Sequence, residues 1–182
     1  MKVVVGVTGA SGAQYALALL RNLKGHDVDL VISEDAKKVI AHEMDVPVKA
    51  FGKLAAHVYA NDDTTAPPSS GSYRFDAMIV VPCSMGTLGK IAWGISDNLI
   101  TRAAAVCLKE RRKLILVPRE TPLAATHLEN MLKLANQGAV VLPAMPGFYH
   151  EPKAMDDLVH FVVGKVLDQL GIEHRLFKRW RE

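Results

Sequence analysis

The sequence has little of several features that mark specialised classes of protein. It contains two cysteines in 182 residues, and Cys83 and Cys107 follow no metal-ligand spacing, which argues against a disulfide framework or a cysteine-ligated metal site. No apolar run reaches the roughly 18 residues of a membrane-spanning helix. The first apolar run begins near residue 2, which leaves no room for a cleavable leader. These features predict a cytoplasmic protein with no membrane partner.

A strong charge of either sign is also missing. The formal net charge is +3, and the basic residues are scattered apart from residues 109–113 and the last few residues. This is too little for a nucleic-acid groove, although it is enough for a small anion. Apolar side chains are plentiful at 49% of the chain, as in a globular protein with a large core. The length predicts one domain, spanning 1–182.

Short apolar runs alternate along the chain with longer stretches whose apolar residues are three and four apart. The short runs predict strands at Lys2–Val7, Val28–Ser33, Ala77–Pro82, Leu114–Pro118 and Val140–Pro143. The longer stretches predict helices at Gln14–Leu23, Ala36–Met44, Thr87–Ala92, Leu99–Lys109, Leu123–Ala135 and Met155–Leu170. The alternation predicts a doubly wound α/β domain, Rossmann-like or flavodoxin-like, with a mostly parallel sheet and helices on both faces. Such sheets bind ligands beyond the carboxyl ends of their strands.

The first loop at that edge is rich in glycine. Gly6, Gly9 and Gly12 are three residues apart, which differs from the G-x-G-x-x-G spacing of dinucleotide sites. Such a bend lets backbone N–H groups and the start of the next helix hold an anion, with the hydroxyl of Ser11 beside them. The same glycines also suit a tight turn with close packing of helix on sheet, and both interpretations stay open.

A second strand-to-helix turn reads VPCSMGT (81–87). Ser84, Gly86 and Thr87 lie where the helix begins, which makes this turn a second candidate for anion binding. Cys83 is either a thiol of lowered pKa at the helix start or a small buried packing residue. Packing is favoured, because no histidine lies nearby in the sequence to act as its base.

Charged residues also follow the strand at 114–118. Arg119 and Glu120 can clamp a phosphate and move a proton, or they can form an internal ion pair. The polar segment 61–76, rich in Pro and Ser, predicts an ordered functional loop rather than a linker. The helix predicted at 155–170 is apolar on nearly all sides, which indicates contact with another subunit.

Five motifs, in order, resemble those of the flavin prenyltransferases, the UbiX-like branch of the flavoproteins, which also include phosphopantothenoylcysteine decarboxylase. They are TGASGAQY, VPCSMGTL, DNLITRAA, LKERRKLILVPRETP and LPAMPGFYHEP, and the likeness runs from the first strand to Trp180. The resemblance implies a metal-independent enzyme that joins the dimethylallyl group of dimethylallyl monophosphate to N5 and C6 of reduced FMN. The prenylated FMN would serve UbiD-type decarboxylases of aromatic acids, including in ubiquinone biosynthesis. It also implies a homo-oligomer, a dodecamer built from trimers, with active sites where subunits meet.

The resemblance further implies roles for residues at matching positions. Those implied to contact FMN are Gly9, Ala10, Ser11, Ser33, Ser84, Met85, Gly86, Thr87 and Arg119. Those implied to hold the prenyl phosphate are Ser70, Gly71, Arg102, Lys109, Tyr149 and Lys165. The implied catalytic residues are Glu43 and Glu120, which would handle protons, and Ser11, which would lie near the flavin ring.

Two positions depart from the family pattern. Thr64 stands where some members have a tryptophan, and Lys165 stands where an arginine is frequent, so that a point charge replaces a bidentate group. Two other functions stay open, a flavin-dependent decarboxylase of a cysteinyl substrate and a non-catalytic protein that binds or delivers FMN. The PRETP motif argues against the decarboxylase, whereas a delivery protein would share most residues with a transferase.

Overall fold

The computed structural model describes residues 1–181. Its strands form one sheet of six in the order β3-β2-β1-β4-β5-β6, and every neighbouring pair is parallel. This is the strand order of the doubly wound dinucleotide-binding folds, so the predicted fold class is confirmed. The strands are β1 (Lys2–Val7), β2 (Asp27–Ile32), β3 (His57–Ala60), β4 (Ala77–Cys83), β5 (Lys113–Pro118) and β6 (Val140–Val141).

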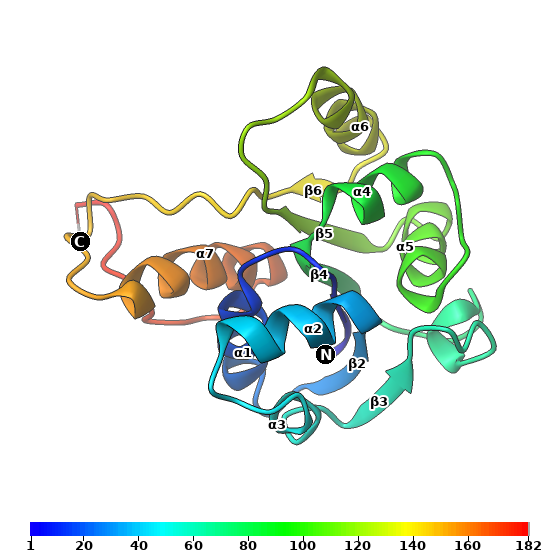
Figure 1. Cartoon of the computed structure of the whole chain (residues 1–182), viewed down its shortest axis with the longest axis horizontal. Coiled ribbons are helices and arrows are strands. Elements are labelled where there is room, and N and C mark those ends of the chain that lie inside the picture. The colour runs from blue at the N-terminus through cyan, green and yellow to red at the C-terminus, as the bar shows by residue number, and fades with distance from the viewer. Residues whose placement is uncertain (182) are drawn as a thin grey trace.

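Helices cover both faces of the sheet (Figure 1). The helices α1 and α7 pack together on one face, and α4, α5 and α6 lie over the other. A single 3-10 turn, η1 (Pro67–Ser69), packs against α5. The helices are α1 (Ala13–Asn22), α2 (Glu34–Glu43), α3 (Lys49–Gly52), α4 (Met85–Ala92), α5 (Leu99–Lys109), α6 (Ala125–Asn136) and α7 (Met155–Leu170).

Two apolar cores result from this layering. Successive residues of a strand point to opposite faces, so Val3 and Val5 of β1 lie in the core with α1 and α7, whereas Val4 lies in the core with α4 and α5. All three side chains are fully buried. This is why the inner strands are continuously apolar rather than alternating.

The structure differs from the predicted elements mainly at the two edges of the sheet. The edge strand β3 was not predicted, because His57, Val58 and Ala60 are exposed and the strand has no continuous apolar run. The opposite edge strand, β6, spans two residues rather than the predicted 140–143. Edge strands bury only part of their surface, so hydrophobic pattern identifies them poorly.

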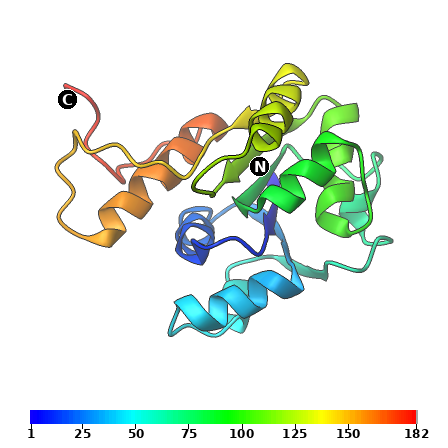
Figure 2. The ribbon, with the colours of Figure 1, turned by 45° about the horizontal axis from the view of Figure 1, so that its top comes forward.

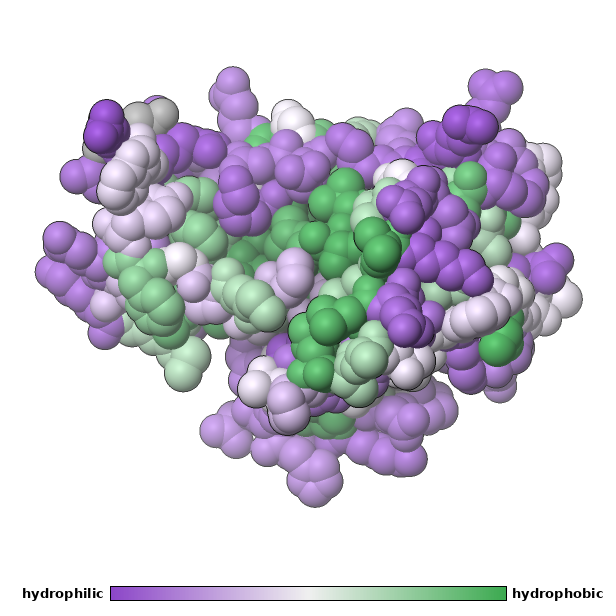
Figure 3. Space-filling model, turned by 90° about the horizontal axis from the view of Figure 1, so that it is seen from above, coloured by the Kyte–Doolittle hydropathy of each residue, from purple (hydrophilic) through white to green (hydrophobic). Residues whose placement is uncertain are grey.

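The segment 142–154 leaves β6 and runs beside α7 as an extended arm, away from the sheet (Figure 2). Several large apolar side chains on the surface belong to this arm or flank it, namely Met145, Phe148, Tyr149, Met155 and Trp180. Figure 3 shows apolar side chains gathered on the face seen from above, the side on which α6 lies in Figure 1. Within residues 1–181, no helix has the length and apolar character needed to cross a membrane.

The hydroxyl of Thr8 ties the carboxyl ends of β1 and β4 together. It donates to the carbonyl of Pro82 at 2.7 Å and accepts the backbone N–H of Ser84 at 2.8 Å. Thr8 is 3% exposed, so both bonds lie in a site of low dielectric constant, where an unmade bond is costly. The two loops that follow β1 and β4 are therefore held side by side.

Candidate active site

A cavity of about 380 Å³ opens at the carboxyl edge of the sheet, near the point where the strand order reverses between β1 and β4. The chain leaves these two strands toward opposite faces, which makes this point the usual ligand site of doubly wound sheets. The volume lies in the range of small-molecule pockets. The neutral polar side chains of its lining are Thr8, Ser33, Asn61, Ser84, Thr87 and Asn98.

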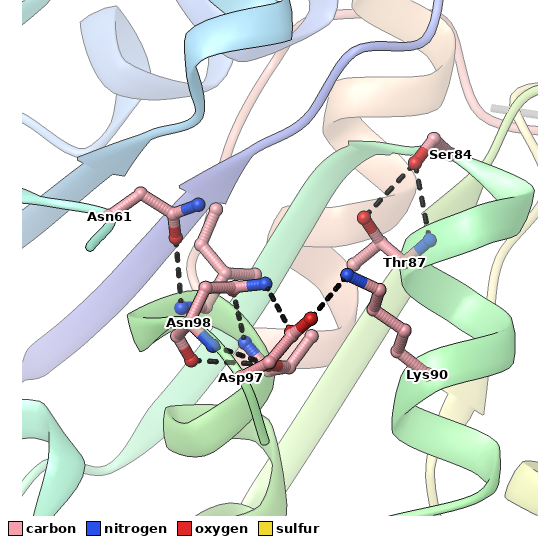
Figure 4. Close-up of polar contacts among 8 residues, drawn as sticks. Asn61, Ser84, Thr87, Lys90, Asp97 and Asn98 are labelled. Atoms are coloured by element: carbon pink, nitrogen blue, oxygen red, sulfur yellow. Dashed lines mark hydrogen bonds and ion pairs between the residues drawn. The ribbon is translucent and has the colours of Figure 1, made fainter. Parts of the chain in front are cut away.

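Three helices begin at this cavity, each with a side-chain cap. The caps are Ser33 for α2, Ser84 for α4 and Asn98 for α5, and each accepts a backbone N–H from three residues further along at 3.1 to 3.3 Å. Figure 4 shows Ser84 and Asn98 at the starts of α4 and α5, with Asn61 next to Asn98. Asn61 accepts the N–H of Ile100 at 3.2 Å. Helix starts carry partial positive charge, so their convergence favours an anionic group in the cavity.

The glycine bend, defined here as residues 8–12, requires both of its glycines, for different reasons. A Cβ on Gly9 would lie 2.6 Å from the Cβ of Asp35, so only glycine lets the bend approach α2 this closely. Gly12 has a φ of 108°, a conformation that side-chain-bearing residues rarely adopt. These observations support the tight-turn interpretation of the two glycines, and the close contact that they show is between the bend and α2.

The start of α1 is occupied by a carboxylate from the chain itself. Oε2 of Glu43, the last residue of α2, accepts the N–H of Gly12 at 2.9 Å and that of Ala13 at 3.3 Å. The interpretation that this helix start holds an external anion needs correction, since Glu43 satisfies the N–H groups that a phosphate would use. The helix starts that face the cavity are those of α2, α4 and α5.

Glu43 belongs to a small charged cluster with Ser11 and Arg119. Partial burial raises the pKa of Glu43, but hydrogen bonds from the Ser11 hydroxyl and from the backbone of Gly12 and Ala13, with the charge of Arg119, outweigh it and leave the pKa below its usual value. Nε of Arg119 donates to the carbonyl of Ser11 at 3.2 Å. Glu43 is therefore an anion at neutral pH, suited to accepting hydrogen bonds and not to donating a proton.

Arg119 and Glu120 have different partners. Arg119 bonds to Ser11, whereas the carboxylate of Glu120 accepts the N–H of Thr121 at 2.9 Å. Both side chains are half-buried. Since each has another partner, these contacts do not support the alternative interpretation of an ion pair between Arg119 and Glu120. Cys83 is fully buried, and burial raises the pKa of its thiol to about 12, which identifies it as a packing residue and not a nucleophile.

The residues implied for FMN gather in two neighbouring places. Those that line the cavity are Gly9, Ser33, Ser84 and Thr87. Met85 and Gly86 form the first turn of α4. Ala10 and Ser11 belong to the glycine bend, and Arg119 bonds to the carbonyl of Ser11. All nine therefore follow β1, β2, β4 or β5 at the carboxyl edge of the sheet.

The residues implied for the prenyl phosphate fall in separate places within one chain. Lys109 ends α5, about 15 Å along the helix from the cavity. There it pairs with Glu110, and a Cβ built on Gly71 would lie 2.5 Å from its Nζ. Ser70 precedes Gly71 in the same loop, and Arg102 is exposed near the start of α5.

Tyr149 and Lys165 lie on a third part of the chain. Tyr149, on the arm, makes edge-to-face contacts with Phe161 and Trp180 at centroid distances of 5.7 and 5.3 Å. Lys165, on α7, lies 3.5 Å from a carboxylate oxygen of Asp168. Neither residue lines the cavity described above.

Sequence reasoning missed several residues of the cavity lining. Asn61 begins the segment predicted as a functional loop, but its own role was not predicted, because β3 was missed and its place at a strand end was hidden. Thr8 directly precedes Gly9, but a buried hydroxyl that joins two strands leaves no recognisable pattern in the sequence. Lys90, Asp97 and Asn98 surround the start of α5, and only the capping character of Asn98 was detectable in the sequence.

The cavity suits a flavin mononucleotide in its donor chemistry. Hydroxyl and amide side chains match the hydroxyl groups of a ribityl chain, and the helix starts match a phosphate. A Cβ on Gly86, in the first turn of α4, would meet no atom within 4 Å, so backbone there is open to a ligand. The residues that would hold FMN are thus those of the cavity and the glycine bend.

The lowered pKa of Glu43 predicts a specific pH dependence of stability. Ionised Glu43 stabilises the folded chain above its ordinary pKa of 4.5, and that contribution is lost as the pH falls through the lower pKa of the folded state. Glu43→Gln should therefore lower the free energy of unfolding at neutral pH, and the difference from wild type should shrink in acid. Urea unfolding at several pH values measures this. The exposed Glu129→Gln is the control, and a difference that stays constant with pH would refute the prediction.

Comparison with known proteins identifies the family. The Flavoprotein family model matches residues 1–167. A relative from Thermoplasma acidophilum, named flavin prenyltransferase UbiX, is 57% identical over 180 residues, which is 99% of this chain and 100% of the relative.

Two solved structures match with a TM-score of 0.97. One is a dodecameric FMN-dependent Ubix-like decarboxylase from Escherichia coli O157:H7, at 48% identity and with 100% of both chains covered. The other is AnUbiX (PadA1) in complex with FMN and dimethylallyl pyrophosphate, at 44% identity and with 100% of this chain and 97% of that chain covered. The chain therefore belongs to the flavoprotein family and, within it, to the flavin prenyltransferases of the UbiX type.

Proposed function

We propose that this chain transfers the dimethylallyl group of dimethylallyl monophosphate to N5 and C6 of reduced FMN and releases prenylated FMN for a UbiD-type decarboxylase. The observation that carries the proposal is the juxtaposition, at one edge of the sheet, of a cavity that suits FMN and a cluster of Ser11, Glu43 and Arg119. The names of the relatives support the same reaction. Reduced FMN is the acceptor substrate: its electron-rich N5 and C6 each form a bond to the prenyl group and lose a proton, one of which is taken up by the allyl double bond and the other by the departing phosphate.

The charges needed for such a reaction are present as fixed side chains. When an allylic carbon–oxygen bond breaks, negative charge develops on the phosphate, and a cation at about 4 Å contributes on the order of 4 kcal/mol at an effective dielectric constant of 20. Arg119 is such a cation at the glycine bend. Several cations together can stabilise the negative charge of the leaving phosphate, as a metal ion does in the reactions of prenyl diphosphates. Exclusion of water protects the allyl cation from capture by water.

The two glutamates are suited to different roles. Glu43 is held ionised by several hydrogen bonds and anchors Ser11 and the start of α1. Glu120 accepts one backbone N–H and is less constrained. Glu120 is therefore the proposed proton carrier toward the departing phosphate, and Glu43 fixes the geometry of the glycine bend.

The remaining cations are proposed to come from neighbouring copies of the chain. The cations Arg102, Lys109 and Lys165, and the phenol of Tyr149, do not line the cavity of their own chain, so a shared site would place them at subunit contacts. Exposed apolar side chains on the arm and on α6 support such contacts. A dodecamer of trimers is the proposed assembly, and the relative from Escherichia coli is named as dodecameric.

Other parts of the proposal concern the setting of the protein. Residues 1–182 are proposed to be one flavoprotein domain, which the match of the family model over 1–167 supports. A cytoplasmic location is also proposed, and the two unpaired thiols, Cys83 and Cys107, are consistent with a reducing compartment.

Prenyl transfer is tested by the mass of the flavin. Purified protein with FMN, a reductant and dimethylallyl monophosphate should yield a flavin heavier by one prenyl unit in mass spectrometry. A parallel reaction with the diphosphate tests the choice of donor. An unchanged flavin mass with FMN bound would overturn the transferase and favour a delivery protein, whereas loss of CO₂ from a cysteinyl peptide would favour the decarboxylase.

Replacement of Glu120 tests its role as proton carrier. Glu120→Gln should slow formation of the heavier flavin by about a hundredfold, the lower range for a general acid, while FMN stays bound. The exposed Glu129→Gln should react like wild type. An undiminished rate in Glu120→Gln would remove this role.

Co-expression of two inactive variants tests whether the site is shared. Glu120→Gln and Lys109→Ala should each be slow alone, but mixed oligomers should recover about a quarter of wild-type activity, because random assembly pairs intact copies of both residues at that frequency. Mixing the lysates of separately expressed variants without subunit exchange is the control. Activity no higher than that of the single variants would contradict a shared site.

A further inference from the structure

The cavity has an unusual balance of charge for a site that is to hold a phosphate. The carboxylates in its lining are Glu34, Asp35, Asp62 and Asp97, whereas its one side-chain cation, among the residues described, is Lys90. A phosphate that enters the cavity meets helix starts, several like charges and this single ammonium group. Lys90 is therefore the side chain best placed to bind a phosphorylated flavin in preference to one without a phosphate.

Lys90 is already engaged with one of those carboxylates. Its Nζ lies 2.6 Å from Oδ2 of Asp97, and the other oxygen of Asp97 accepts from the amide of Asn98 at 2.9 Å. Figure 4 shows Lys90 extending from α4 toward Asp97, which precedes α5. Both side chains are nearly half exposed, at 42% and 49%, so the pair lies at the mouth of the cavity and can exchange partners with little cost.

The position of Lys90 on α4 directs it to the same place as the cap of that helix. Lys90 is three residues beyond Thr87, so the two side chains share one face of the helix. The hydroxyl of Thr87 is bonded to that of Ser84 at 3.0 Å. A phosphate at the start of α4 would thus lie within reach of a flexible lysine side chain.

We propose that Lys90 makes this site selective for FMN over riboflavin. Asp97 is its counter-ion before the flavin binds, and the phosphate of FMN then replaces Asp97 as the partner of Lys90. The inference rests on the proposed function, since it assumes that the flavin binds in this cavity. Asp97 then opposes the phosphate as a like charge, which limits the affinity for FMN. The prenylated product carries the same phosphate, so the same pair also governs its release.

The test compares two ligands that differ only in the phosphate. FMN and riboflavin are titrated into the full chain, with flavin fluorescence as the readout. Lys90→Gln should weaken FMN binding by about tenfold, a size typical of one half-exposed charge-assisted hydrogen bond, and leave riboflavin within about twofold. Lys90→Arg should retain most of the FMN affinity. Lys24→Gln, which removes the same charge from an exposed position outside the cavity lining, should leave both affinities unchanged.

Replacement of Asp97 should change FMN binding in the opposite direction. Asp97→Asn removes the competing carboxylate and should tighten FMN binding by a few-fold, again without effect on riboflavin. The preference for FMN should weaken with salt in the wild type and less so in Lys90→Gln. Thermal unfolding of each variant shows whether the fold is retained.

Either of two results would overturn the inference. Equal weakening of FMN and riboflavin in Lys90→Gln would mean that the lysine acts through the fold, and an unchanged FMN affinity would mean that the phosphate binds elsewhere. Weaker FMN binding in Asp97→Asn would remove the counter-ion role. These binding results are independent of turnover, so failure of the prenyl-transfer assay remains a separate finding.

Discussion

The buried hydroxyl of Thr8 is the contact on which the geometry of the site depends. It joins β1 and β4 beyond the last regular pairing of the two strands, where β4 also shows a register shift against β5. Without this bond the N–H of Ser84 would lose its partner in a buried position. Since Ser84 caps α4, and Thr8 is the first residue of the glycine bend, one side chain fixes both walls of the crevice.

The crevice has two chemically different ends. At the cavity, capped helix starts present N–H groups and hydroxyls, with a lysine and an aspartate at the mouth. At the glycine bend, Glu43 and Arg119 are held around Ser11. A flavin that spans the two would have its phosphate among helix starts and its ring among the charged side chains. Separation of these environments lets one end bind tightly while the other end reacts.

Hydrophobic pattern predicted the inner part of the fold because the inner strands are buried on both faces and the helices have one apolar face. The same rule failed at β3, where exposed residues form an edge strand with no apolar run. The site was predictable where a glycine, a hydroxyl or a charge follows a strand, as for Gly9, Ser84 and Arg119. The cap of α1 was not, since the carboxylate of Glu43 comes from 31 residues away from Gly12 and no local pattern carries that information.

The cap that Glu43 provides has a consequence for how the chain tolerates changes in length. The carboxylate at the end of α2 caps the start of α1, so α2 must keep its length and these two helix ends must stay together. An added residue inside α2 would rotate Glu43 by about 100° around the helix axis and away from Gly12. Insertions between these elements are best accommodated where the backbone faces open space, as at Gly25, where an added Cβ would meet no atom within 4 Å.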